Sequence, residues 1–238
     1  MMERHFDMDL QQLKERILYM GSLAETMIHV AVKALVDRVL ELTADVYRHE
    51  EEVNRLQIEI DDRCLKIIAL HAPAAGDLRF VTAGMKINAD LERIADQAVN
   101  ICQTTEFLLQ EPPLKPLIDV PRMAEIAISM LKDALDSFVN KDEALARAIL
   151  IRDDQVDELK DQVFRELLTY MIADPSTIKR AIDLILVSRN LERIADHATN
   201  IAEDVVFVIA GKDIRHRAEE YPGLPPPLSY GGETGREK

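Results

Sequence analysis

The sequence predicts an all-α protein built as a duplicated three-helix bundle, with six helices in two pseudo-symmetric repeats. Trp is absent and only 8 of 238 residues are Gly, whereas 47% are apolar and 30% are charged, a balance typical of long amphipathic helices. Apolar residues recur at three- and four-residue steps along most of the chain. The motif L-E-R-I-A-D also occurs twice, in "ADLERIADQAVNI" from Ala89 and in "NLERIADHATNI" from Asn190. Its repetition predicts two similar units.

Three helices are expected before the first proline cluster. The first runs from roughly Asp9 to Leu40, where one apolar stripe continues for many turns. Thr43 is a candidate N-cap for the second helix, which continues to about Leu70. Pro73, Gly76 and Asp77 then break and restart the chain, with Asp77 as the expected cap of a third helix to about Leu109.

The second repeat is expected to follow the same plan after a proline-rich boundary. The segment "EPPLKPLIDVP" carries four prolines in eleven residues, which no helix interior tolerates. We therefore expect repeat one at residues 1–111, repeat two at 118–212 and a flexible tail rich in Pro and Gly at 213–238. The helices of repeat two are predicted at about Arg122–Val139, Asp142–Ile172 and Pro175–Ala210.

Matches elsewhere in the chain support duplication of a whole domain. Ala24-Glu25 corresponds to Ala124-Glu125 at the same offset as the two long motifs. The second helix matches the fifth at an offset three residues larger, with Val53 against Val156. A period near 100 residues is too long for a solenoid repeat and indicates two duplicated bundles.

The repeated motif places acids and amides away from the apolar face of its helix. On a helical wheel Glu192, Asp196 and Asn200 form a stripe separate from the core residues, and Glu92, Asp96 and Asn100 repeat it. Two acids four residues apart repel each other and destabilise a helix by about 0.2 to 0.5 kcal/mol. The pattern therefore calls for compensation, by basic side chains such as Arg93 and Arg193 or by a metal ion.

A second pair of positions favours metal without excluding salt bridges. Glu50 and Asn54 on the second helix match Asp153 and Asp157 on the fifth, so each half would offer oxygen ligands from two neighbouring helices. Carboxylate and amide oxygens suit Mg²⁺, Mn²⁺, Ca²⁺ or iron, and zinc less well. The predicted metal ligands are Glu50, Glu92, Asp96, Asp153, Asp157, Glu192 and Asp196, with Asn54, Asn100 and Asn200 as possible additions.

Composition and motifs argue against several classes of function. A net charge of −14 disfavours binding to nucleic acid or to an anionic bilayer and suits cations or basic partner surfaces. The sequence has neither a membrane-spanning run nor a signal-peptide pattern at its start, so a cytoplasmic protein is expected. No nucleotide-binding, hydrolase or zinc-protease motif is present, and the paired Glu-x-x-His motifs of a di-iron enzyme are missing. We therefore expect no enzymatic activity.

Two isolated residue types are interpreted as unrelated to the acids. His197 has Gln97 as its counterpart in the first half, so it is interpreted as a solvated surface residue. Cys64 and Cys102 each stand alone in a helical pattern, which indicates buried or idle thiols rather than a disulfide or a thiolate metal site.

The doubled motif and its surroundings resemble the PhoU family of accessory regulators of bacterial phosphate uptake. The resemblance rests on both copies of L-E-R-I-A-D-x-A-x-N-I, on "PAAGDLRF" before the first, on "DPSTIKRAIDLIL" before the second and on "GKDIRH" at the close. It covers most of residues 7–216 and excludes the tail. Its implied fold is a pair of three-helix bundles of the PhoU or spectrin-like type.

The resemblance also implies a function and a set of ligands. It implies surface metal clusters, with iron, zinc or other ions, at Glu50, Glu92 and Asp96 and at Asp153, Asp157, Glu192 and Asp196. Asn54 departs from the pattern, so the first cluster should be the weaker one. The implied role is that of a negative regulator linking the ATPase of the phosphate ABC transporter to a membrane sensor kinase, and we also expect a homodimer. The alternative is a structural helical adaptor or metal-binding protein without a role in phosphate signalling.

Overall fold

The computed structural model describes residues 2–211 and 214, and side chains from His5 onward, so the predicted tail lies outside the described residues apart from Ile214. Within these residues the chain forms helices and no strand, which confirms the all-α prediction. The α-helices are α1 (Met2–Val36), α2 (Thr43–His71), α3 (Ala75–Leu108), α4 (Asp119–Asn140), α5 (Glu143–Ala173) and α6 (Ile178–Ala210), and the 3₁₀ turns are η1 (Leu40–Leu42) and η2 (Pro175–Thr177). None of the described helices is both long enough and apolar enough to cross a membrane.

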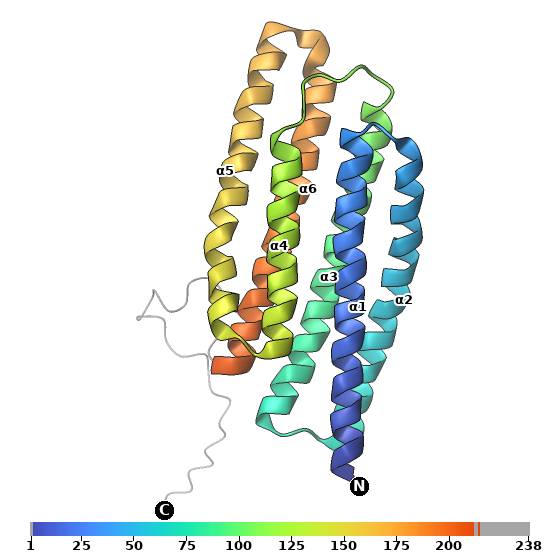
Figure 1. Ribbon diagram of the computed structural model, residues 1–238, viewed down its shortest axis with the longest axis vertical. Coiled ribbons are helices and arrows are strands. Elements are labelled where there is room, and N and C mark those ends of the chain that lie inside the picture. Colours follow the sequence, from blue (N-terminus) through green and yellow to red (C-terminus); the bar gives the residue numbers. More distant parts are fainter. Residues whose placement is uncertain (1, 212–213, 215–238) are drawn as a thin grey trace, which may run out of the picture.

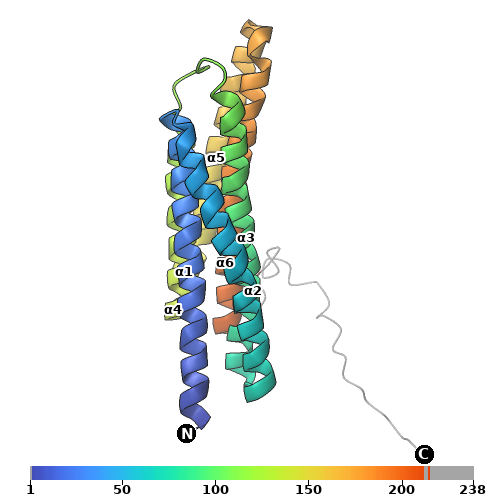
Figure 2. The same cartoon turned by 90° about the vertical axis from the view of Figure 1, so that its right-hand side faces the viewer.

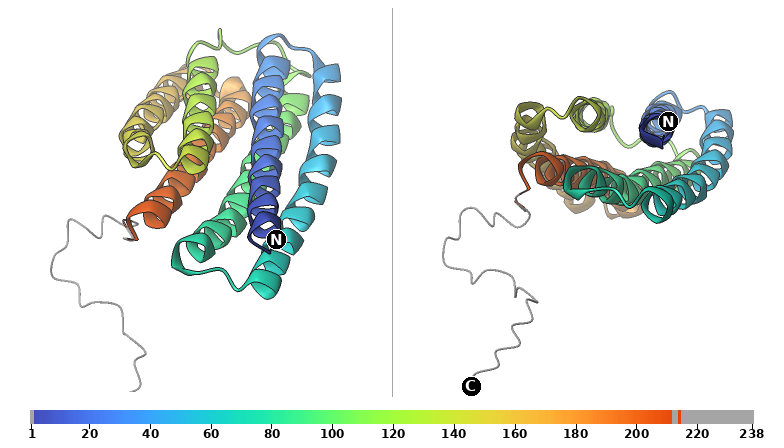
Figure 3. Two further views of the ribbon diagram at one scale, coloured as in Figure 1. Left: turned by 60° about the horizontal axis from the view of Figure 1, so that its bottom comes forward. Right: turned by 90° about the horizontal axis from the view of Figure 1, so that it is seen from below.

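The six helices run along the long axis of the molecule in two layers (Figures 1 and 2). Seen along the helices, α2, α3, α6 and α5 form one curved layer, with α1 and α4 on its inner side (Figure 3). Helices α3 and α6, which carry the repeated motif, lie side by side at the centre of this layer and join the two halves. The hairpin between α5 and α6 projects at one end of the molecule, and the hairpin between α2 and α3 lies at the other (Figure 1).

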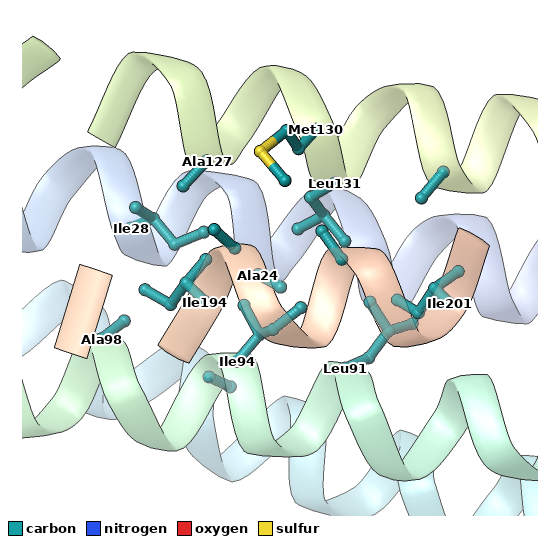
Figure 4. Packing of buried hydrophobic residues seen from close by; sticks show 14 of the residues in the cluster. Ala24, Ile28, Leu91, Ile94, Ala98, Ala127, Met130, Leu131, Ile194 and Ile201 are labelled. Carbon is teal, nitrogen blue, oxygen red and sulfur yellow. The ribbon is translucent and has the colours of Figure 1, made fainter. Parts of the chain in front are cut away.

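Buried side chains from both halves form one continuous hydrophobic core. At its centre α1, α3, α4 and α6 meet, and residues such as Ile28, Ile94, Leu131 and Ile194 point toward one another (Figure 4). Each of these four side chains is fully buried. Because the residues of the two repeats interdigitate here, the halves stabilise each other.

Two contacts show how closely the halves approach. The rings of Phe80 on α3 and Phe138 on α4 stack with their centroids 4.5 Å apart. On α1, a Cβ atom added to Gly21 would lie 2.1 Å from Cδ1 of Leu135 on α4. The Leu135 side chain therefore occupies the space that a side chain at position 21 would need, and any larger residue there would force Leu135 to move.

The helix ends differ from the sequence prediction in physical detail. Thr43 does not cap α2, because its hydroxyl donates to the Leu40 carbonyl (2.8 Å) and the N-cap position is occupied by Leu42. Asp77 does not cap α3 either, since the helix starts earlier, at Ala75. In repeat two, α4 starts at Asp119 and includes Pro121 in its first turn. Proline is tolerated there because the N–H groups of the first turn have no acceptor within the helix.

Other helix ends are set by local hydrogen bonds and by glycine. The Asp174 carboxylate accepts a hydrogen bond from the Ser176 N–H (2.9 Å), with Pro175 next in the chain, although the turn that follows is 3₁₀ and α6 begins only at Ile178. Gly211 ends α6 with a left-handed φ of 66°. Asp142 caps α5 by accepting from the Leu145 N–H (3.0 Å).

An arginine from each half holds the proline-rich linker in place. Arg38, which follows α1 and has a φ of 59°, donates to the carbonyl oxygens of Leu109 and Glu111 (3.1 and 2.7 Å). Arg180 on α6 donates to the carbonyl oxygen of Pro112 (3.0 Å). Positive φ is unfavourable for a residue with a side chain, so these two hydrogen bonds help to stabilise Arg38 in that conformation.

Candidate functional site

The predicted acidic residues lie on the curved layer, on the side away from α1 and α4. The core residues of α6, among them Leu191 and Ile194, point inward, while Glu192 and Asp196 stand at a different angle on the helix. Glu192 is partly buried and Asp196 is exposed. The motif therefore serves two purposes: its apolar positions build the core and its acids line the outer surface.

The structure brings together the four acids predicted for the second half, which we call the second acidic cluster: Asp153 and Asp157 on α5, and Glu192 and Asp196 on α6. Burial and the nearby carboxylates of Asp196, Asp157 and Glu192 raise the pKa of Asp153 to about 6. Burial and the carboxylates of Glu192 and Asp157 also raise the pKa of Asp196. The mutual repulsion expected from the sequence is therefore present.

Lys160 joins the second acidic cluster as a counterion that the sequence analysis missed. Its Nζ donates to Asp157 Oδ1 (2.7 Å) and to Glu192 Oε1 (3.1 Å), linking α5 to α6. The hydrogen bond to Asp157 is the main cause that raises the pKa of Lys160. The spacing in the sequence indicates this ion pair, because Lys160 follows Asp157 by three residues and therefore lies on the same face of the helix.

The first acidic cluster, Glu50 on α2 with Glu92 and Asp96 on α3, is also assembled. Burial raises the pKa of Glu50, and Asp96 and Glu51 raise it further. Burial and Asp96 likewise raise the pKa of Glu92. Glu92, Asp96 and Glu50 are each partly buried. At the position equivalent to Lys160 this half has Gln57, which carries no charge.

The three amides that were possible additions are placed differently. Asn54 follows Glu50 by one helical turn and is exposed, and Asn100 follows Asp96 by one turn and is partly exposed. Asn200 instead lines an open groove between α3 and α6, together with Lys86, Arg93 and His197. Its place in that groove separates it from the α5 side of the second acidic cluster.

His197 is not the solvated residue that the sequence suggested. Its Nδ1 lies 2.8 Å from Oδ1 of Asp90 on α3, and both side chains are mostly buried. His197 also lies close enough to Glu92 and Asp196 to offset part of the rise in pKa that burial and the neighbouring carboxylates cause in both. The error arose because position 97 in the first half is Gln, so the repeat gave no hint of an ion pair between the halves.

Several other polar groups tie α3 to α6. Lys86 Nζ lies 2.7 Å from Oδ1 of Asp204, which is almost fully buried. Arg79 Nε donates to the carbonyl oxygen of Val208 (3.3 Å).

Both predicted lone thiols, Cys64 and Cys102, are buried and free, and burial raises the pKa of each to about 12. These thiols are therefore protonated at neutral pH and inert.

The acids were tested as metal ligands on their observed geometry. In the part of the chain that the structure describes, no three Asp, Glu, His or Cys side chains are arranged to hold a metal ion. The chemistry of the donors nevertheless fits a hard cation, because each cluster gathers carboxylates whose mutual repulsion a cation would relieve. In the second acidic cluster a cation would have to displace Lys160.

An all-helical duplicated bundle with acidic clusters on its outer layer places the chain in the class of duplicated α-helical bundle proteins. The family model described as the PhoU domain matches twice, at residues 17–105 and 120–205. The chain belongs to the PhoU family. These two matches correspond to the two repeats read from the sequence.

Named relatives and solved structures agree with this assignment. A phosphate-specific transport system accessory protein PhoU homolog of Aquifex aeolicus is 41% identical over 88% of this chain and 95% of its own length. The homolog of Zymomonas mobilis is 40% identical over 89% and 90% of the two chains. The crystal structure of PhoU from Pseudomonas aeruginosa superposes with a TM-score of 0.84 at 35% identity, covering 87% of this chain and all of that one. That of the regulatory protein PhoU from Streptococcus pneumoniae gives 0.80 at 27% identity, covering 87% and 98%.

Proposed function

We propose that this chain is a negative regulator of phosphate uptake and phosphate-starvation signalling. It acts in the cytoplasm by binding the ATPase of a phosphate ABC transporter and a membrane sensor kinase. The observation that carries the proposal is the match over nearly the whole length to proteins named as accessory to the phosphate-specific transport system. Regulation by binding also suits a molecule whose polar residues lie on an outer helical layer.

Electrostatics supplies a means of association. With a net charge of −14, the molecule is attracted to basic patches on a partner, which speeds encounter and favours the correct orientation. Such attraction is screened within about 8 Å at physiological ionic strength. Binding to either partner should therefore weaken as salt is added.

The two acidic clusters are proposed as metal sites of this regulator. Glu50, Glu92 and Asp96 would hold one ion, and the four acids of the second acidic cluster would hold the other. Iron, zinc, manganese, magnesium or calcium remain the candidate ions. A bound cation would neutralise the crowded carboxylates and fix α2 against α3 and α5 against α6. Elemental analysis of protein purified without an affinity tag, before and after a chelator, tests this proposal; absence of metal in both samples would contradict it.

A deletion strain tests the regulatory role. Without this chain, phosphate-starvation genes should stay switched on when phosphate is plentiful, and reintroduction of the chain should repress them. A reporter fused to a starvation promoter measures both. Normal repression in the deletion strain would instead favour a structural helical adaptor, a role with which the Lys160 counterion is also compatible. The expected homodimer stays a prediction, to be checked by light scattering of the purified chain.

A further inference from the structure

The hairpin formed by α5 and α6 exposes a stripe of large apolar side chains. Six of them are between 41% and 75% exposed although each lies in the middle or at the end of a well-formed helix. They recur every four residues, so each set of three follows one face of its helix. The set on α5 is Phe164, Leu168 and Ile172, and the set on α6 is Ile178, Ile182 and Leu186.

The register of the two helices places these sets opposite each other. Helices α5 and α6 are antiparallel neighbours joined at η2 (Figure 1), and Lys160 bonds to Glu192 across them. Continuing this register towards η2 brings each apolar residue of α5 to within two residues of one on α6, with Phe164 near Leu186, Leu168 near Ile182 and Ile172 near Ile178. The apolar stripe is therefore two helices wide, and its other end leads directly into the second acidic cluster.

The first half carries only part of this stripe. Of the six equivalent positions on α2 and α3, three are polar and one is a small alanine, while two keep an exposed leucine: the polar residues are Asp61, Thr82 and Lys86, the alanine is Ala69, and the leucines are Leu65 and Leu78. There Asp61 accepts from Asn88 (3.0 Å), the Thr82 hydroxyl donates to its own helix, and Lys86 pairs with Asp204. At these three positions the same fold forms with polar groups that are bonded within the molecule, so Phe164, Ile182 and Leu186 are not required by the bundle. The apolar residues of the second half have no such internal role, and contiguous exposed apolar surface marks interaction sites.

Charge identifies the kind of partner. Lys160, Arg165 and Arg189 lie beside or within the stripe, but beyond it the four carboxylates of the second acidic cluster, with Asp154 next to them in the chain, outnumber Lys160 and Arg193. An occupant must therefore be apolar along most of its contact and basic at one end.

We propose that the α5–α6 hairpin is a docking surface for an amphipathic helix of a partner protein. The apolar face of that helix would cover the six residues, and lysines or arginines at one of its ends would reach the second acidic cluster. The contact would run along two neighbouring antiparallel helices, and a partner helix would lay its apolar face against them, a common mode of peptide recognition. The surface spans about 20 residues of α5, or about 30 Å, which a single partner helix can match.

Charge also disfavours other occupants. A second copy docked on this particular surface would lack the basic end that the second acidic cluster calls for, whereas a dimer through another surface is not affected by this argument. An anionic bilayer would be repelled by the net charge of −14. A partner helix with basic residues at one end would be attracted to the acidic cluster and not repelled by it. The inference rests on the proposed function only in that both require the chain to bind a protein.

The test uses the full chain and a designed peptide of about 20 residues, with leucines on one helical face and lysines at one end. Fluorescence anisotropy at low salt should show saturable binding to the unmodified chain. The double variant Leu168→Ser/Ile182→Ser should weaken binding at least about tenfold. The matched control Leu65→Ser/Leu78→Ser, which removes exposed leucines from the first half, should leave the affinity within about twofold. Circular dichroism confirms that both variants are folded.

A second peptide with glutamates in place of the lysines tests the charge argument and should bind at least about tenfold more weakly. The proposal is overturned if the lysine peptide fails to bind, if both doubles weaken it equally or if the glutamate peptide binds as tightly. It is also overturned if light scattering shows a dimer that only Leu168→Ser/Ile182→Ser dissociates, because the occupant would then be a second copy. None of these readouts depends on phosphate, so they can fail or succeed separately from the deletion-strain experiment.

Discussion

The two halves of the molecule share one arrangement of helices but carry different side chains at several equivalent positions on their outer surfaces. On α2 and α3 the outer positions near the hairpin include Asp61, Thr82 and Lys86, whose polar groups are bonded within the chain. On α5 and α6 the equivalent positions are Phe164, Ile182 and Leu186, all exposed, whereas Leu168 and Ile178 have exposed leucines as their first-half counterparts. A duplicated fold can keep its core while one copy is free to acquire an interaction surface, so the comparison separates what folding needs from what binding needs.

The acidic clusters differ in the same way. The second has Lys160 between its carboxylates, whereas the first has the uncharged Gln57 at that position. The sequence suggested that Asn54 makes the first cluster the weaker metal site. Lys160 acts in the opposite direction, because a cation entering the second cluster must first displace an ammonium group.

The largest expected effect concerns what the halves have in common. Ile94→Ala and Ile194→Ala remove equivalent, fully buried side chains from the shared core, so each should lower the free energy of unfolding by about 2 to 5 kcal/mol. Because the core is continuous, urea unfolding followed by circular dichroism should show one cooperative transition in both variants. Two separated transitions, or a loss in only one variant, would mean that the halves fold independently.

The shared core was largely predictable from sequence, whereas the polar contacts were not. Spacing located all six helices, and the offset of about one hundred residues paired Glu92 with Glu192, because periodicity and duplication act on every residue of a long helix. Thr43 and Asp77 were wrongly expected to cap, since capping depends on a backbone turn that several nearby residues could start. Lys160 and the Asp90–His197 pair depend on the register between helices, which one sequence does not specify.

Removal of the built-in counterion should affect the two clusters unequally. Lys160→Gln should raise the affinity of the second acidic cluster for Mn²⁺ by about tenfold, because the cation no longer competes with an ammonium group at short range. Calorimetric titration in a chain whose first cluster is silenced by Glu92→Gln and Asp96→Asn measures this. The reciprocal variant Gln57→Lys, with the second cluster silenced, should weaken Mn²⁺ binding to the first. Unchanged affinity in both variants would show that the residue at this position does not compete with the cation, and the absence of any binding would argue that neither cluster is a metal site.

Neutralising one crowded acid should stabilise the fold in a pH-dependent manner. The pKa of Asp153 is raised to about 6, a shift equivalent to about 3 kcal/mol before solvent screening and about 1 kcal/mol after it. A raised pKa means that the charged form is disfavoured in the folded state. The cost is complete above about pH 6 and disappears as the pH falls to about 4. Asp153→Asn should therefore raise Tm by about 2 to 4 °C at pH 7.5.

The same variant should have little effect on Tm near pH 4, where the native carboxyl is also neutral. Glu50→Gln in the first half, at a site with fewer carboxylate neighbours, should give a smaller gain at pH 7.5. Calorimetric scans of the three proteins at both pH values are sufficient, and a gain for Asp153→Asn that persists unchanged at pH 4 would rule out repulsion as its cause.

The smallest effect distinguishes a helix cap from an acid that only sits in a first turn. Asp142→Ala removes a carboxylate that accepts from the Leu145 N–H and should cost about 1 kcal/mol. Asp77→Ala in the first half removes no capping bond and should cost less than about 0.5 kcal/mol. Urea midpoints of the two variants measure the difference, and equal costs would show that the Asp142 bond contributes little.

The claim that the second half carries the regulatory surface can be measured directly in cells. The deletion strain is complemented with the unmodified chain, with Leu168→Ser/Ile182→Ser or with Leu65→Ser/Leu78→Ser, at matched protein levels, and a phosphate-starvation reporter is read in high phosphate. We predict that the unmodified chain and the first-half variant repress the reporter, while the second-half variant leaves it on. Full repression by the second-half variant would contradict the account.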